Sequence, residues 1–128
     1  IGFEVEGSGL ATSRSYIRAH RDVVKSALKA YVEGIYFAFA NKEPTLKTLA
    51  RYMRTSEQEV LDYSYEHYLK GTPKKPYPTI KGIQNLIDMS APQVPQAKTA
   101  KPEQFVDLSF LQELEKEGFF EEMARRYR

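Results

Sequence analysis

The sequence predicts a mainly α-helical fold, a bundle of about five to six helices with one short strand or hairpin near the N-terminus. From Ser13 onward, apolar residues recur at helical spacing, and serine, threonine or aspartate residues stand where helices would begin. Before Ser13 the spacing differs, because Phe3 and Val5 alternate with glutamates at the period of a strand. The 128 residues are enough for a single domain, 1–128, with a modest core.

The N-terminal segment, residues 2–12, has the composition of a strand followed by a turn. Gly7, Ser8 and Gly9 permit a turn after the alternating residues, and residues 10–12 are a candidate for a second extended stretch. One strand, or one pair of strands, does not form a stable sheet by itself. The segment therefore indicates a sheet whose other strands are absent from this chain.

The first two helices are defined by their caps and by one apolar stripe. Ser13 is placed to cap a short helix that runs through Ala19. The main helix is expected from about Arg21 to Asn41, with Pro44 in the first turn of the next helix. The apolar stripe of the main helix consists of Val24, Leu28, Tyr31, Ile35 and Phe39.

The middle of the chain predicts three more helices. The helix after the main one, counted here as the second long helix, carries apolar residues through Met53. Ser56 with Glu59 then forms a capping-box pattern that starts the third. Gly71 is expected to end that helix in the left-handed conformation. Thr79 is placed to cap a fourth helix.

Two proline-rich stretches connect the later helices. Residues 72–78 and 91–102 each contain three prolines, which favours extended, non-helical backbone. Because long irregular connections are uncommon in compact domains, the second stretch is expected to cross a surface larger than this chain supplies. Asp107 is placed to cap a fifth helix that Gly118 ends, and a short helix follows.

The composition excludes several classes of function. The net charge is only +2 and basic residues are interleaved with acidic ones, which argues against nucleic acid as a partner. The absence of cysteine excludes disulfides and cysteine metal sites. No apolar run approaches the roughly 20 residues that a membrane-spanning helix needs.

The residues that support catalysis in other proteins are scattered here. His20 and His67 have no partner at metal-ligand spacing, so no metal site is predicted. The glutamates of residues 113–122 lie in a solvated helical stretch, whereas a catalytic pair needs a cleft and shifted pKa values. We therefore expect no catalytic residue, no cofactor and a protein that is not an enzyme.

Thr12, Ser13 and Arg14 are the candidate ligand-binding residues. They follow two glycines at a helix start, where free backbone N–H groups and the helix dipole favour an anion. Two hydroxyls and a guanidinium add donors for such a group. An ordinary turn followed by a helix N-cap explains the same residues, so both interpretations stay open at this stage.

Six phrases along the chain resemble those of a known family. They are SRSYIR at 13–18, HRDVVK at 20–25, LKAYVEGI at 28–35, LKTLARYM at 46–53, KPYPT at 75–79 and AKPEQFVD at 100–107. In this order they resemble the C-terminal half of bacterial ABC-transporter substrate-binding proteins of the nitrate, sulfonate, taurine and thiamine-pyrimidine-precursor type. The resemblance covers about residues 9–120 and specifies the family better than the ligand.

The resemblance implies that the chain is a fragment of a two-lobe α/β periplasmic-binding-protein fold. Its parent would hold a small polar or anionic solute between the lobes, in a periplasmic or extracellular membrane-anchored location. The implied partners are this small-molecule solute, the membrane subunits of the ABC transporter and the missing N-terminal lobe of the same protein. A fragment that exposes the flank facing this lobe is also expected to self-associate.

Two other functions are compatible with the sequence. The nine tyrosines and seven phenylalanines, many near the edges of helix stripes, also suit a free-standing helical protein–protein interaction module. Some relatives of the resembled fold are enzymes that make the thiamine pyrimidine. The residues needed for that reaction would lie in the absent half, so this chain gives no support to the enzymatic alternative.

Overall fold

The computed structural model describes residues 7–128, which form seven α-helices and two short 3₁₀ helices, with no strand in that part of the chain. The elements are α1 (Arg14–Ala19), α2 (Arg21–Ala40), α3 (Lys42–Met53), α4 (Gln58–Gly71), α5 (Ile80–Ser90), η1 (Pro95–Thr99), η2 (Pro102–Phe105), α6 (Ser109–Lys116) and α7 (Phe119–Arg126). The mainly helical character expected from the sequence is thus confirmed.

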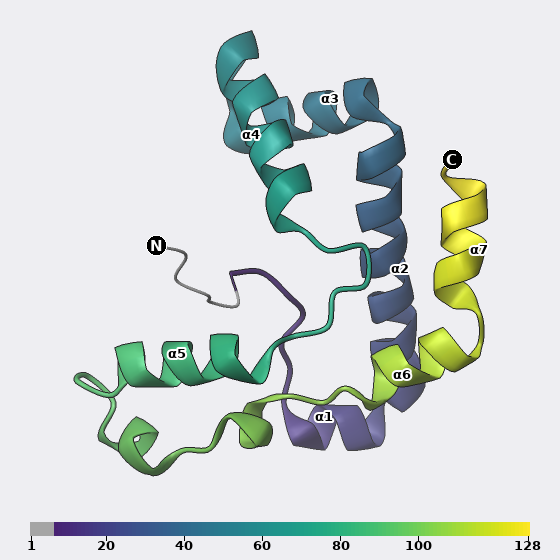
Figure 1. Ribbon diagram of the computed structural model, residues 1–128. Helices are drawn as coiled ribbons and strands as arrows, with labels where there is room; N and C mark the ends of the chain where they lie inside the picture. Colours follow the sequence, from purple (N-terminus) through teal and green to yellow (C-terminus); the bar gives the residue numbers. More distant parts are fainter. Residues whose placement is uncertain (1–6) are drawn as a thin grey trace.

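The helices form an open crescent (Figure 1). Its spine is α2, whose 20 residues extend about 30 Å at the helical rise of 1.5 Å per residue. One arm consists of α3 and α4, the other of α5 with η1 and η2. Helix α6 packs across one end of α2, and α7 runs beside α2. The N-terminal segment passes between the arms before it enters α1.

The main core lies where α2, α6 and α7 meet. Val32 and Leu114 are completely buried there, and each large apolar side chain removed from water contributes about 1.5–3 kcal/mol. The buried residues of this cluster are Val32, Tyr36, Leu111, Leu114, Phe120 and Met123. The core therefore fixes α6 and α7 on the spine without help from either arm.

The arm made of α3 and α4 has a small core of its own. Leu46, Leu61 and Tyr65 are buried between the two helices. The Tyr65 hydroxyl donates a hydrogen bond to the backbone carbonyl of Ala38 at 2.9 Å. This buried bond ties the arm to the end of the spine.

The arm made of α5, η1 and η2 is held to the rest of the chain through α1. Ile87 and Pro102 are buried where α5 meets η2. The Arg14 guanidinium donates to the backbone carbonyl of Gln104 in η2 at 2.6 Å. Because η2 packs on α5, this contact places the arm relative to α1.

Three of the predicted caps are confirmed. The Ser13 side chain accepts a hydrogen bond from the backbone N–H of Tyr16 at the start of α1. The Thr79 side chain does the same for Gly82 at the start of α5. Gly118 adopts a left-handed φ of 73° between α6 and α7.

The predicted caps of α4 are wrong at both ends, although the helix does end at Gly71. Ser56 is not the cap, because the Thr55 hydroxyl accepts the N–H of Glu57 and the helix begins one residue later. Gly71 is the last helical residue and is not left-handed. Thr72 ends the helix in an extended conformation, the one that a residue before proline prefers.

Two predictions for residues 91–108, the helix cap at Asp107 and the irregular proline-rich stretch, also differ from the structure. Asp107 stands one residue before the actual N-cap, Leu108, and its carboxylate accepts hydrogen bonds from the backbone N–H and the hydroxyl of Ser109. Residues 91–102 are not structureless, because they contain η1 and the start of η2. Both 3₁₀ helices begin with proline, which is tolerated at a first helical position because the N–H it lacks would have no partner there.

The predicted N-terminal strand or hairpin consists of two stretches, which are considered separately. The alternating residues Phe3 and Val5 lie outside the described residues. The second stretch, residues 10–12, was a candidate for extended backbone, and it carries no assigned strand. A strand needs a neighbour for its hydrogen bonds, and residues 7–128 supply none.

Candidate functional site: a hollow inside the crescent

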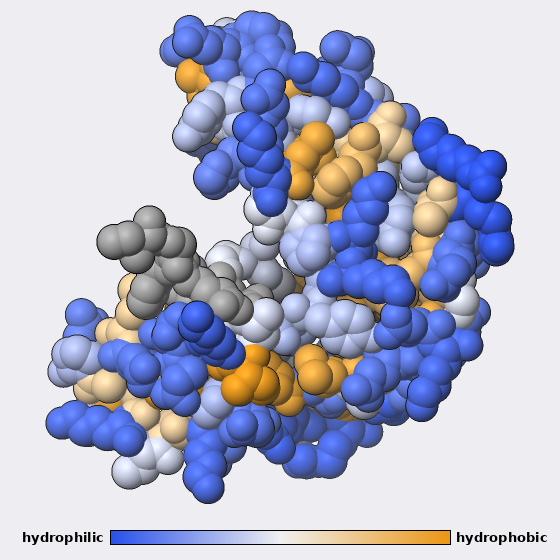
Figure 2. Space-filling view, in the orientation of Figure 1, coloured by the Kyte–Doolittle hydropathy of each residue, from blue (hydrophilic) through white to orange (hydrophobic). Residues whose placement is uncertain are grey.

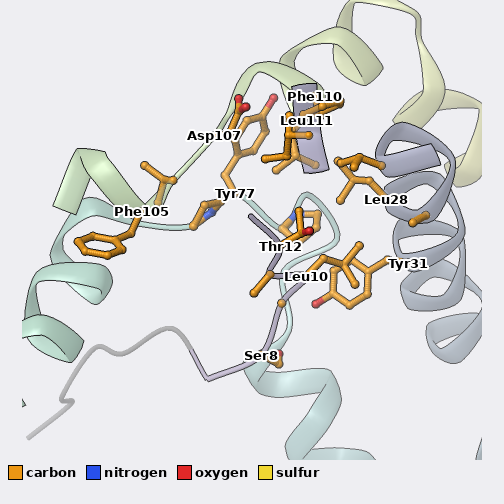
Figure 3. A pocket seen from close by; sticks show the side chains of 18 of the residues that line it. Ser8, Leu10, Thr12, Leu28, Tyr31, Tyr77, Phe105, Asp107, Phe110 and Leu111 are labelled. Atoms are coloured by element: carbon orange, nitrogen blue, oxygen red, sulfur yellow. The ribbon is translucent and has the colours of Figure 1, made fainter. Parts of the chain in front are cut away.

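The concave side of the crescent contains a hollow of about 1300 Å³. Figure 2 shows a notch between the two arms of the crescent, and Figure 3 shows the side chains around the hollow. The lining comes from the N-terminal segment, α1, α2, residues 71–78, η2 and the start of α6. A hollow of this size is large enough for a small organic solute.

The wall formed by α2 and α6 is apolar. Leu28 and Tyr31 from α2, and Phe110 and Leu111 from α6, surround the hollow in Figure 3. They are adjacent to the main core, since Leu28 packs against it and Leu111 belongs to it. Val23, which also lines the hollow, is 47% exposed, so part of this apolar wall faces solvent.

Two of the three predicted ligand residues line the hollow. Thr12 lies on the N-terminal segment that crosses it, as Figure 3 shows, and Arg14 follows in the first turn of α1. Both side chains are exposed. The Arg14 guanidinium uses one nitrogen for the Gln104 carbonyl and keeps other N–H groups for a further acceptor.

The third predicted residue, Ser13, does not line the hollow. Its hydroxyl accepts from the backbone N–H of Tyr16 at 3.1 Å and lies 2.9 Å from the Ser15 hydroxyl. Because α1 has only six residues, its end provides no strong dipole for an anion. The structure therefore gives Ser13 the ordinary role of a helix cap.

Two acidic residues of the hollow were not predicted as part of a site. Glu103 in η2 and Asp107 before α6 both line it. The carboxylate of Asp107 is engaged with Ser109, at 3.0 Å from its N–H and 2.6 Å from its hydroxyl. Their position depends on the path of residues 91–107 against α5 and α1, for which the sequence carries no local signal.

A small polar network fixes the wall formed by residues 72–78. Lys75 donates to one oxygen of Glu115 at 2.5 Å, and Tyr77 donates to the other at 2.8 Å. The Lys75 hydrogen bond is the main cause of the lowered pKa of Glu115. Burial, followed by the hydrogen bond to Glu115, raises the pKa of Tyr77 to about 12. The network thereby attaches the proline-rich stretch to α6.

Neither histidine contributes to the hollow. His20 lies against Tyr16, with ring centroids 4.6 Å apart, and His67 stacks on Tyr63 at 6.1 Å. Within residues 7–128, no three His, Cys, Asp or Glu side chains are grouped as a metal ion requires. The same part of the chain contains no helix that is both long and apolar enough to cross a membrane.

Comparison of the chain with protein-family models, with curated proteins and with solved structures gives no match.

Proposed function

We propose that this chain is the helical C-terminal part of a solute-binding protein that serves an ABC transporter. In this proposal a second lobe closes over the hollow and a small polar or anionic solute is held between the two lobes. The observation that carries the proposal is the hollow itself, which has an apolar wall and is also lined by Thr12 and Arg14. An apolar floor with a few polar groups is the usual composition of a solute site.

The open side of the crescent is consistent with a missing lobe. Val23, Leu10 and Phe105 line the hollow and are 47%, 57% and 62% exposed, respectively. Exposed apolar side chains that line one hollow are the kind of surface that another part or partner covers. A lobe seated on the hollow would cover this surface and complete the site.

The test is to extend the reading frame upstream of the codon for Ile1 and to measure thermal unfolding of both the extended and the present protein. Nitrate, taurine and a pyrimidine are added in separate experiments, because a bound solute raises stability by about 2.7 kcal/mol at 100 times its dissociation constant. We expect the extended protein to contain a βαβ-rich lobe and to be stabilised by one solute. A start codon immediately before Ile1 would contradict the proposal.

A second candidate function is a helical protein–protein interaction module, and the arm made of α3 and α4 favours it. Tyr52 is 79% exposed and Tyr63 is 70% exposed on this arm. Tyrosine and arginine are enriched at interfaces, and the Arg51 guanidinium lies 6.0 Å from the centre of the Tyr52 ring. Loss of a partner after Tyr52→Ala, with solute binding absent, would support this alternative.

A further inference from the structure

The 72–78 segment connects α4 to α5 and contributes to the lining of the hollow. Its three prolines have no backbone N–H to donate. Within residues 7–128, the backbone of residues 73–78 forms a single hydrogen bond, from the N–H of Tyr77 to the carbonyl of Lys75 at 2.9 Å, and both groups belong to the segment. The position of the segment therefore depends on its side chains rather than on its backbone.

Two groups of side-chain contacts hold the segment on the helices. On α6, Glu115 accepts a hydrogen bond from Lys75 with one carboxylate oxygen and from Tyr77 with the other, at 2.5 and 2.8 Å. On α2, the ammonium of Lys74 lies 5.0 Å from the centre of the Phe39 ring. Hydrogen bonds to a charged group are stronger than exposed contacts between a cation and a ring. Glu115 is therefore the main polar attachment of the segment.

The part of the segment that faces the hollow follows directly after Lys75. Pro76, Tyr77 and Pro78 are half-buried and line the hollow, and Figure 3 shows Tyr77 at its wall. Tyr77 also packs against the main core. Glu115 does not itself line the hollow, but it binds the residues on both sides of Pro76. A carboxylate outside the hollow thus determines where this wall lies.

We propose that Glu115 is a positioning residue for this wall: its carboxylate fixes the 72–78 segment on α6, and loss of that attachment lets the segment lift and opens the hollow on this side while the helices stay folded. The helices stay folded because the buried residues of the main core come from α2, α6 and α7, and none belongs to the segment. Local openings of this kind cost less free energy than global unfolding. The inference concerns the chain by itself, whatever occupies the hollow, and does not rest on the proposed solute.

The first test is limited trypsin digestion under native conditions, with the cut after Lys74 identified by mass spectrometry. Cleavage at this bond follows the population of the open segment when opening and closing are fast. Glu115→Gln removes the charge and should speed this cut about threefold, the effect of an exposed ion pair. Glu115→Ala also removes the acceptor of the Tyr77 hydroxyl and should speed the cut about tenfold.

The matched controls are Glu117→Gln and Glu117→Ala. Glu117 stands at the end of the same helix and pairs with Lys25 and Lys29 on α2 rather than with the segment. These variants should leave the rate of the cut after Lys74 unchanged. Urea unfolding followed by circular dichroism should give the same midpoint for each Glu115 variant and its control, which separates local opening from unfolding of the helices.

The second measurement reports access to the hollow. The chain has no tryptophan and Tyr31 on α2 lines the hollow, so the indole of Tyr31→Trp is a single reporter there (Figure 3). Quenching of its fluorescence by acrylamide should rise when Glu115→Ala is added and stay unchanged with Glu117→Ala. Equal acceleration of the cut after Lys74 in both pairs of variants, or quenching that does not respond to Glu115→Ala, would each overturn the inference. If Tyr31→Trp does not fold, the digestion decides by itself.

Discussion

Tyr77 and Glu115 join two elements that are far apart in the sequence, since the Tyr77 hydroxyl donates to a Glu115 oxygen at 2.8 Å. The first residue belongs to the proline-rich stretch and the second to α6. A stretch with three prolines forms few hydrogen bonds of its own. Its side chains therefore have to attach it to the helices, and this contact, with Lys75 on the other oxygen of Glu115, does so.

The first prediction concerns Tyr77→Phe at high pH. The folded pKa is about 12 and the ordinary value is 10.0, so the stabilisation linked to the neutral phenol is fully present below pH 10. It is lost as the pH rises through 12, because the unfolded phenol ionises first. We expect the wild type to be more stable than the variant at neutral pH and the difference to shrink between pH 10 and 12. Urea unfolding at several pH values measures it, and a constant difference would contradict the assignment.

The second prediction concerns the core where the spine meets α6. Leu114 is completely buried, so Leu114→Ala leaves a cavity and should lower the free energy of unfolding by about 2–5 kcal/mol. Met89 on α5 is 60% exposed and serves as the control, because Met89→Ala should change it by no more than about 0.5 kcal/mol. Chemical denaturation of both variants provides the comparison. Similar losses for the two would show that the core is not where we place it.

The third prediction uses two glycines with opposite expected effects. Gly118 has a φ of 73°, so Gly118→Ala should destabilise the chain by about 1 kcal/mol through strain in the left-handed conformation. Gly34 lies within α2, and a Cβ added there meets no atom within 4 Å. Gly34→Ala should therefore stabilise the chain by about 0.5–1 kcal/mol. Thermal unfolding of the two variants should give shifts of opposite sign.

The sequence predicted those features whose cause is local. Ser13, Thr79 and Gly118 act on backbone within a few residues of themselves, so their roles could be inferred without tertiary structure. The same capping rules gave wrong predictions where a neighbouring residue took over the capping role. The Thr55 hydroxyl displaced the expected cap at Ser56, and Pro73 removed the need for a left-handed Gly71.

Local capping rules could not predict the hollow, because it is formed by contacts between segments that are far apart in the sequence. Thr12 and Arg14 were selected for their place at a helix start, and two of the three selected residues do line the hollow. Glu103 was not selected, because η2 reaches the hollow only through its packing on α5 and its contact with Arg14. The left-handed conformation of Arg54, which ends α3, could not be predicted either, because arginine has no preference for that conformation.

The last prediction separates the two roles that the sequence left open for the candidate site. Thr12 lines the hollow, whereas the Ser13 hydroxyl accepts the N–H of Tyr16. With a solute that stabilises the protein, Thr12→Val should weaken binding in calorimetric titration and leave the melting temperature of the free protein unchanged. Ser13→Ala should instead cost about 1 kcal/mol of helix stability and speed amide exchange at Tyr16, with the affinity unchanged. If Ser13→Ala weakened binding more than Thr12→Val did, the helix start itself would be the site, and the wall of the hollow would serve only to pack against another lobe.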